Sequence, residues 1–93
     1  MIQQIIMWRV NNPEDVKTFA ATLATMKNKI PSLHHMEIHI NERNSPSAFD
    51  LCFISQFKDQ AALSDFEQDP LHQQVVKTIK PLIKERTIVQ SRI

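Results

Sequence analysis

The sequence predicts an α+β fold in which one four-stranded antiparallel sheet carries helices on a single face. Three observations lead to this prediction. Apolar and polar residues alternate, as in strands, near the start, the middle and the end of the chain. Two regions between them repeat apolar residues at helical spacing, and proline and asparagine mark the junctions. The order is strand, helix, strand, strand, helix pair, strand, a split βαβ pattern that folds into one sheet covered on one side.

The first strand is expected over residues 1–10, where both alternating faces carry large apolar side chains. Such a strand needs cover on both sides. The first helix follows, with Asn12 as its N-cap and Pro13 at its first position. An apolar stripe at three- and four-residue spacing extends from Val16 to Ile30, and Pro31 is expected to end the helix.

The remaining elements are two strands, two short helices and a last strand. Strands are expected over residues 34–41 and 48–57, joined by a polar loop. Asp59 can cap a helix over residues 60–67. Pro70 opens another helix, which Pro81 ends or kinks, and residues 84–93 form the final strand. A basic cluster near the end of this second helix is expected to complement the helix dipole and aid solubility rather than bind an anion: Lys77, Lys80, Lys84 and Arg86.

Composition indicates one globular domain, residues 1–93, and excludes several functions. A net charge of +1 argues against binding to nucleic acid, and no run approaches the ~18 apolar residues of a membrane span. The sequence has no glycine, which excludes the glycine-rich loops that hold phosphates and dinucleotides. Turns must therefore rely on asparagine and aspartate, which tolerate left-handed geometry, and the obvious candidates are Asn11, Asn12, Asn41 and Asn44.

The single cysteine, Cys52, excludes an internal disulfide and a cysteine-built zinc site. It lies inside an expected strand without an adjacent cation, so we expect a buried, inert thiol. The amino terminus lacks the pattern of a secretory signal. A reducing, cytoplasmic location is the resulting expectation.

Self-association follows from the strand pattern. Helices on one side of the sheet leave the other face of the first strand, around Ile5 and Met7, without cover. An exposed apolar sheet face of this size is too large for a soluble monomer. We therefore expect a two-fold homodimer in which two sheets pack face to face.

Four stretches occur in a characteristic order and spacing across nearly the whole chain. They are Met1-Ile2 with Ile5-Ile6-Met7-Trp8-Arg9, Ile30-Pro31, Asn44-Ser45-Pro46 with Phe49-Asp50-Leu51, and Asp69-Pro70-Leu71-His72 with Pro81-Leu82. Together they resemble the stress-responsive α/β-barrel, or Dabb, domain family. The resemblance implies a ferredoxin-like subunit that pairs into a dimeric α/β barrel. Family members include plant stress proteins, a few cofactor-free polyketide cyclases and many bacterial proteins of unknown role.

The chain departs from that family at two positions. Family members commonly carry a histidine where this chain has Gln4, and the cyclase-type members place a tyrosine where it has Phe66. Of these three family residues only the histidine of the Asp69-Pro70-Leu71-His72 turn is present. The resemblance therefore implies a pocket more strongly than it implies a cyclase, and it implies no cofactor.

His72 is the candidate catalytic residue. It lies in the first turn of its helix, where the positive end of the dipole favours a neutral imidazole that can accept a proton. Next to an apolar cleft, near the side of the sheet that bears Gln4 and Leu51, it would serve as a general acid or base. The alternative is structural: a hydrogen bond from His72 to the backbone or to Asp69 that fixes the turn between the helices.

The remaining candidates also have two interpretations. Gln4 either orients a ligand or meets solvent near a sheet end. The apolar candidates either line a pocket or fill the core: Trp8, Leu51, Phe53 and Phe66. A metal site within one chain is not expected, because His35 and His39 share a strand face but lie ~13 Å apart along it, too far for one ion with bonds near ~2 Å.

Three functions stay open. The first is a small binding protein with an apolar, aromatic pocket between the sheet and the helices of each subunit. The second is a cofactor-free enzyme, resembling a cyclase, lyase or monooxygenase, that acts on a flat apolar carbonyl compound with His72 as acid and base. The third is a dimeric interaction module without a ligand.

Overall fold

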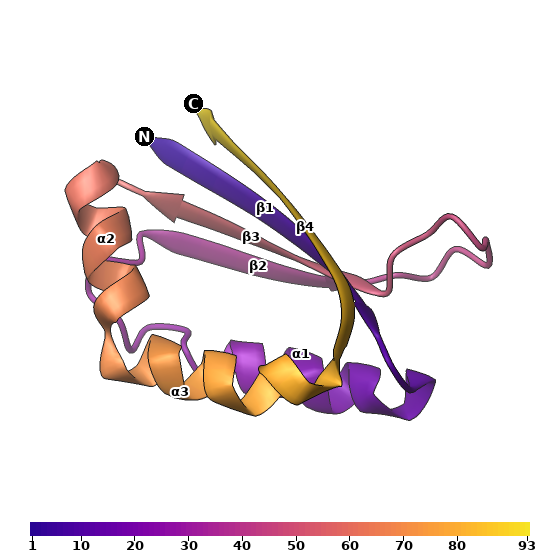
Figure 1. Cartoon of the computed structure of the whole chain (residues 1–93). Helices are drawn as coiled ribbons and strands as arrows, with labels where there is room; N and C mark the ends of the chain where they lie inside the picture. Colours follow the sequence, from indigo (N-terminus) through magenta and orange to yellow (C-terminus); the bar gives the residue numbers. More distant parts are fainter.

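The computed structural model describes all 93 residues and contains the expected elements in the expected order (Figure 1). The strands are β1 (Ile2–Val10), β2 (His35–Ile40), β3 (Leu51–Phe57) and β4 (Ile83–Arg92). The helices are α1 (Val16–Ala24), α2 (Gln60–Gln68) and α3 (Pro70–Ile79), with short 3₁₀ turns at Pro13–Asp15 and Lys80–Leu82. None of these helices has both the length and the apolar character that crossing a membrane requires.

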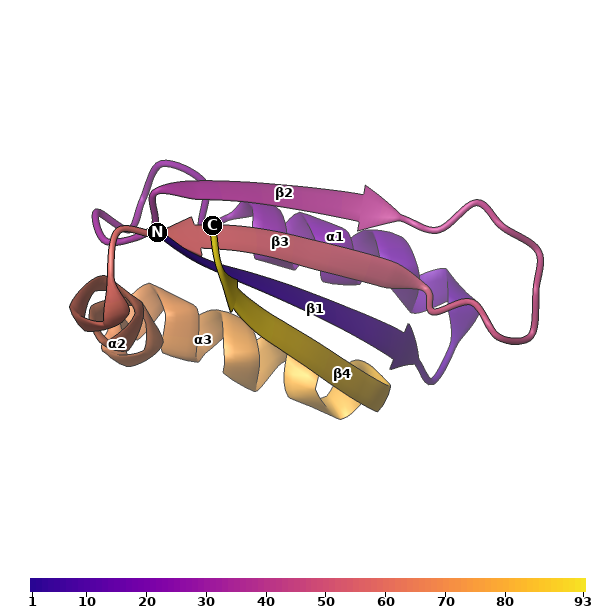
Figure 2. The same ribbon diagram turned by 90° about the horizontal axis from the view of Figure 1, so that it is seen from above.

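The strands form one antiparallel sheet in the order β2-β3-β1-β4. α1 and α3 run along one face of this sheet, and α2 stands at the end where β3 finishes (Figures 1 and 2). The predicted α+β fold, with helices on one face of a four-stranded antiparallel sheet, is confirmed.

The core fills the space between the sheet and the helices. β1 turns its even-numbered side chains, from Ile2 to Val10, toward the helices, and all of them are buried. Trp8 packs against Phe19 of α1 with ring centroids 4.9 Å apart. Phe57 at the end of β3 packs against Phe66 of α2 with centroids 5.0 Å apart. Each large apolar side chain buried in this way contributes about 1.5–3 kcal/mol to the hydrophobic stabilisation.

The opposite face of the sheet, here called the outer face, carries no helix (Figure 1). The odd-numbered side chains of β1 point to it, and the register places apolar neighbours beside two of them. Ile5 lies between Ile54 and Val89, and Met7 lies between Cys52 and Thr87. Val89 is 63% exposed and Met7 is 38% exposed. The expected uncovered apolar face is therefore present.

The first helix is shorter than predicted. It ends at Ala24 rather than near Ile30, because the following amides bond to carbonyls three residues back instead of four, as Met26 does to Leu23. Tight turns continue the chain to Lys29. Met26 and Ile30 are buried nonetheless. The apolar spacing therefore predicted correctly which residues are buried, but the predicted length of the helix was wrong.

Asparagine does supply the left-handed turn position, but at a residue that the sequence did not single out. Asn28 has φ of 61°, and it is the only residue with positive φ. The expected side-chain cap at Asn12 is also absent. Its carbonyl oxygen, and not its side chain, accepts a hydrogen bond from the amide of Asp15 at 3.0 Å.

Two aspartates fix the corner between α2 and α3. Asp59 Oδ1 accepts a hydrogen bond from the Ala62 amide at 2.9 Å and caps α2 as expected. Asp69 Oδ1 accepts one from the Leu71 amide at 2.8 Å and caps α3, which begins at Pro70. This second cap determines where the first turn of α3 lies and therefore where His72 is placed.

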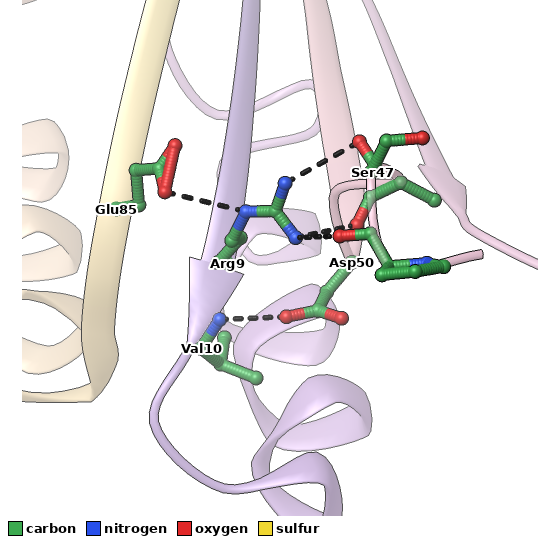
Figure 3. Close-up of polar contacts among 7 residues, drawn as sticks. Arg9, Val10, Ser47, Asp50 and Glu85 are labelled. Carbon is green, nitrogen blue, oxygen red and sulfur yellow. Dashed lines mark hydrogen bonds and ion pairs between the residues drawn. The ribbon is translucent and has the colours of Figure 1, made fainter.

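β3 begins at Leu51, later than predicted. Asp50 still bonds through its backbone to Trp8 and Asn41, but the carbonyl oxygens of the residues before it bond to Arg9 (Figure 3). The Arg9 guanidinium donates to the carbonyl oxygens of Ala48 at 2.9 Å and Ser47 at 3.3 Å, and its Nε lies 3.3 Å from Glu85. The carboxylate of Asp50 accepts the Val10 amide at 2.8 Å. The donors of Arg9 are thus occupied by the protein itself. These hydrogen bonds hold the loop before β3 against β1.

Candidate functional site

A cavity of about 490 Å³ lies between the sheet and α3. This volume is within the ~300–1,000 Å³ that small-molecule sites occupy. Sixteen residues line the cavity, and 11 of them are hydrophobic. The sheet contributes side chains from β1, β3 and β4, and the helices contribute side chains from α1, α2 and α3.

All of the predicted site residues except one line this cavity. Gln4, Trp8, Phe53, Phe66 and His72 are brought together there from β1, β3 and the two helices after β3. Leu51 is not part of the lining, so its assignment to the pocket was wrong. It pairs with Trp8 in the sheet and is 2% exposed, because the core packs around it on all sides.

The imidazole of His72 is held by the α2–α3 corner. Its Nδ1 lies 3.2 Å from the carbonyl oxygen of Glu67. A carbonyl oxygen can only accept a hydrogen bond, so Nδ1 must carry the proton, and in the neutral ring Nε2 keeps its lone pair. The ring also packs on Phe66 with centroids 4.3 Å apart. His72 therefore combines the two roles weighed from the sequence, a backbone hydrogen bond and a place in the cavity wall, whereas Asp69 bonds to Leu71 instead.

Gln4 and Trp8 of β1 also belong to the cavity wall. Gln4 is 8% exposed, so the interpretation that it meets solvent was wrong. Its Nε2 donates to Gln90 Oε1 at 2.9 Å, and its own Oε1 receives no hydrogen bond from the protein. The indole N–H of Trp8 is buried and has no acceptor. The cavity thus carries few polar groups on largely apolar walls, which is the usual composition of a ligand site.

Sequence reasoning missed the charged residues of the lining. Lys80 and Arg86 both border the cavity, as does Glu67. The signal was present in their spacing. Lys80, the residue directly after α3, is eight residues after His72 and continues the same helix face, and Arg86 shares one face of β4 with Ile88. In the sequence, the four residues of the basic cluster differ little, because all of them lie near a helix end. Only the tertiary structure shows that Lys80 and Arg86 line the cavity and that Lys77 and Lys84 do not.

Comparison with known families identifies the chain. The family model for the stress responsive A/B barrel domain, Dabb, matches residues 2–92. The chain belongs to this family. No curated protein matches it significantly.

Several solved structures have the same fold as this Dabb domain, all at low sequence identity. A dimeric ferredoxin-like protein of unknown function from Thermobifida fusca has a TM-score of 0.88 and 19% identity, over 99% of this chain and 90% of that one. A Dabb family protein from Mesorhizobium loti has a TM-score of 0.82 and 19% identity, over 99% and 95%. A hydroxynitrile lyase from Passiflora edulis has a TM-score of 0.84 and 14% identity, over 99% and 92%. These similarities establish the ferredoxin-like fold.

On the outer face, the Dabb domain carries a second group of titratable side chains along β2. Nε2 of His35 lies 2.9 Å from one carboxylate oxygen of Glu37, and Nε2 of His39 lies 3.0 Å from the other. The hydrogen bond to His35, followed by that to His39, lowers the pKa of the Glu37 carboxyl below its ordinary value. The group is exposed, on the edge strand, and separate from the cavity.

Cys52 lies on the same outer face, opposite Met7. It is half-buried rather than fully buried, and burial raises the pKa of its thiol. A raised pKa leaves less thiolate at neutral pH and makes a poor nucleophile. This agrees with the expectation of an inert cysteine.

Proposed function

We propose that this Dabb domain binds a small apolar or aromatic molecule in the cavity between the sheet and α3. The observation that carries the proposal is the cavity itself, about 490 Å³ with 11 of its 16 lining residues hydrophobic. Buried aromatic side chains, Trp8, Phe53 and Phe66, form its inner wall. A flat ligand can stack on such rings, and each good aromatic contact adds about 0.5–1.5 kcal/mol beyond the area that it buries.

The polar groups of the wall would orient such a ligand. Gln4 Oε1 and His72 Nε2 both lack a protein partner and can accept hydrogen bonds from a ligand hydroxyl. Satisfied polar contacts of this kind give specificity to a pocket whose affinity comes from apolar burial. No cofactor is needed for this function.

A fluorescence titration tests the proposal directly, because Trp8 is the only tryptophan and it lines the cavity. Flat aromatic, polyketide-like and fatty-acyl compounds would be screened for a change in its emission and in the melting temperature. A ligand present at a hundred times its Kd stabilises the protein by about 2.7 kcal/mol. If no class of compound changes either signal, the proposal is wrong and a ligand-free interaction module becomes the better description.

A second candidate function is a cofactor-free enzyme that resembles a cyclase, lyase or monooxygenase. The observation that favours it is the tautomer of His72, since the bond to Glu67 leaves Nε2 free to take a proton from a carbon next to a carbonyl group. One structural neighbour is a hydroxynitrile lyase. His72→Asn tests this role, because asparagine can still donate to the Glu67 carbonyl but offers no base. Turnover should disappear while binding and folding remain. Unchanged turnover in the variant would refute the role.

We further propose that two copies pair through the outer face into a dimeric α/β barrel. The apolar centre of that face supports this, as does the T. fusca neighbour, which is described as dimeric. Sedimentation equilibrium at micromolar concentration should give twice the mass of one chain. Val89→Lys should give a monomer, and Val76→Lys, a matched exposed valine on α3, should remain a dimer. A wild-type mass equal to one chain would refute the dimer.

The proposed location is a reducing compartment such as the cytoplasm. The support is chemical, since Cys52 is the only cysteine and is free, and oxidising compartments favour chains with paired cysteines. Thiol labelling of protein taken directly from cells, before and after reduction, tests it. A thiol that reacts only after reduction would contradict this location.

A further inference from the structure

The mouth of the cavity is marked by those lining residues that remain exposed. Among the apolar residues of the lining, Val76 is 41% exposed and Ile88 is 42% exposed. The charged residues of the lining, Glu67, Lys80 and Arg86, are exposed as well. Apart from Glu67 near the end of α2, these residues belong to the last part of α3, to the turn that follows it and to the middle of β4. The cavity therefore opens between α3 and β4, and its buried aromatic wall lies on the inside.

Polar side chains border the cavity from the helix side and from the sheet side. His72 and Val76 of α3 and Lys80, the residue directly after α3, follow one another at four-residue spacing. His72 and Lys80 therefore lie ~12 Å apart along the helix direction. On the sheet, Arg86 pairs with Trp8, and Gln90 pairs with Gln4. Lys80 begins the turn that joins α3 to β4 and Arg86 lies beyond it, and both line the cavity, whereas His72 lies toward the start of α3.

The charges of Lys80 and Arg86 are not neutralised by the protein. Neither Lys80 nor Arg86 forms a salt bridge, since the ion pairs of this chain involve Arg9 with Glu85 and two histidines with Glu37. The only acidic residue of the lining is Glu67, near the end of α2. Two cations and one carboxylate give the lining a net charge of +1 when His72 is neutral.

We infer that the ligand of this cavity is an amphipathic monoanion, a carboxylate carried on an apolar body. This inference rests on the binding function proposed above and names its ligand class. Lys80 and Arg86 hold the carboxylate at the mouth, where the guanidinium fork of arginine matches its two oxygens. The apolar body extends inward along Val76 and Ile88 to Trp8. A monoanion balances the net charge of the lining, whereas a phosphate monoester, with a charge of about −1.5 to −2, exceeds it.

The test compares ligands of equal length that differ only in the head group. Octanoate, octan-1-ol, octylamine and octyl phosphate would each be titrated at neutral pH with the emission of Trp8 as the signal. We expect octanoate to bind most tightly, the neutral alcohol about fivefold to twentyfold more weakly, and the cationic amine most weakly of all. Each ion pair at an exposed site corresponds to a factor of roughly five, from about 1 kcal/mol.

Four variants locate the charge recognition. Lys80→Gln and Arg86→Gln should each weaken octanoate roughly fivefold and leave octan-1-ol unchanged. Lys77→Gln and Lys84→Gln are the matched controls, since both remove a neighbouring cation that does not line the cavity. They should leave both affinities unchanged at physiological salt, where the Debye length is about 8 Å.

The remaining outcomes separate the two proposals. Equal affinity for octanoate and octan-1-ol would overturn the anion preference and leave the apolar pocket intact. Tighter binding of octyl phosphate than of octanoate would overturn the carboxylate assignment. Equal losses in the control variants would show that the charge effect is general and not a property of the mouth. Absence of binding by all four compounds would overturn this inference, and the screen with flat aromatic and polyketide-like compounds would then decide the proposed function separately.

Discussion

The imidazole ring of His72 packs on the phenyl ring of Phe66, with centroids 4.3 Å apart and planes inclined at 45°. Phe66 is 4% exposed and belongs to both the core and the cavity wall. The same imidazole is bonded to the carbonyl of Glu67. Two successive residues at the end of α2 thus orient a side chain in the first turn of α3. The angle between the two helices therefore determines where the His72 imidazole lies in the cavity wall.

The His72–Phe66 contact should be measurable as a coupling free energy. His72→Ala removes one hydrogen bond and the ring contact, so we expect the free energy of unfolding to fall by about 1 kcal/mol. In a double-mutant cycle with Phe66→Leu, the coupling should be about 0.5–1 kcal/mol. Urea unfolding of the variants measures both values. Gln73→Ala, an exposed neighbour in the same turn, is the control, and a coupling of zero would show that the rings pack independently.

Ser55 provides a prediction in the opposite direction, an increase in stability. Its hydroxyl is fully buried next to Gln4 in the sheet and has no hydrogen-bond partner. Burying an unpaired hydroxyl is unfavourable, so Ser55→Ala should raise the free energy of unfolding by about 1 kcal/mol. Ser91→Ala, on the exposed end of β4, should change nothing. A loss of stability in Ser55→Ala would indicate that a buried water or a weak bond satisfies the hydroxyl.

The fold could be predicted from the sequence because its strands differ clearly from its helices in period. β1 alternates between two faces, and the cap at Asp69 with Pro70 marks the start of α3 without tertiary information. The end of α1 could not be predicted, because its apolar spacing continues through tight turns that bury Met26 and Ile30 just as a helix would. Burial is encoded in the pattern, whereas the hydrogen-bonding period is not.

The cavity was predictable only in part, and for a similar reason. Phe53 and Leu51 occupy the same face of β3 and look equivalent in sequence, yet only Phe53 borders the cavity. Which core residue touches a void depends on how far α3 stands from the sheet. Lys80 and Arg86 both border the cavity only because the chain reverses between α3 and β4. The local sequence pattern encodes neither the distance between α3 and the sheet nor the positions that the reversal of the chain gives to these two cations.

The α3 cap should contribute to stability independently of the cavity. Asp69→Ala removes the acceptor for the Leu71 amide and should lower the free energy of unfolding by about 1 kcal/mol. Asp69→Asn keeps an acceptor oxygen and should recover most of this loss. Asp65→Ala, an exposed aspartate of α2 outside the cap, is the control. If Asp69→Asn were as unstable as Asp69→Ala, negative charge at the helix start would matter more than the hydrogen bond.

The last prediction concerns pH and the outer face. The pKa of Glu37 is lowered, first by the hydrogen bond to His35 and then by that to His39. A carboxyl whose pKa is lower in the folded state stabilises the fold above its unfolded pKa of about 4.3. This contribution is lost as pH falls through the folded value. His35→Gln and His39→Gln together should therefore raise the pKa of Glu37, and should reduce stability above pH 5 more than at pH 3.

NMR titration of the Glu37 side-chain carboxyl carbon measures the pKa directly, and urea unfolding at several pH values measures the linked stability. His34→Gln is the matched control, because His34 precedes β2 and forms no bond to Glu37. An unchanged Glu37 midpoint in the double variant would show that the two histidines do not stabilise the carboxylate in solution. A shift that appears only in the dimer would instead place β2 at the interface, because burying the group there strengthens its hydrogen bonds.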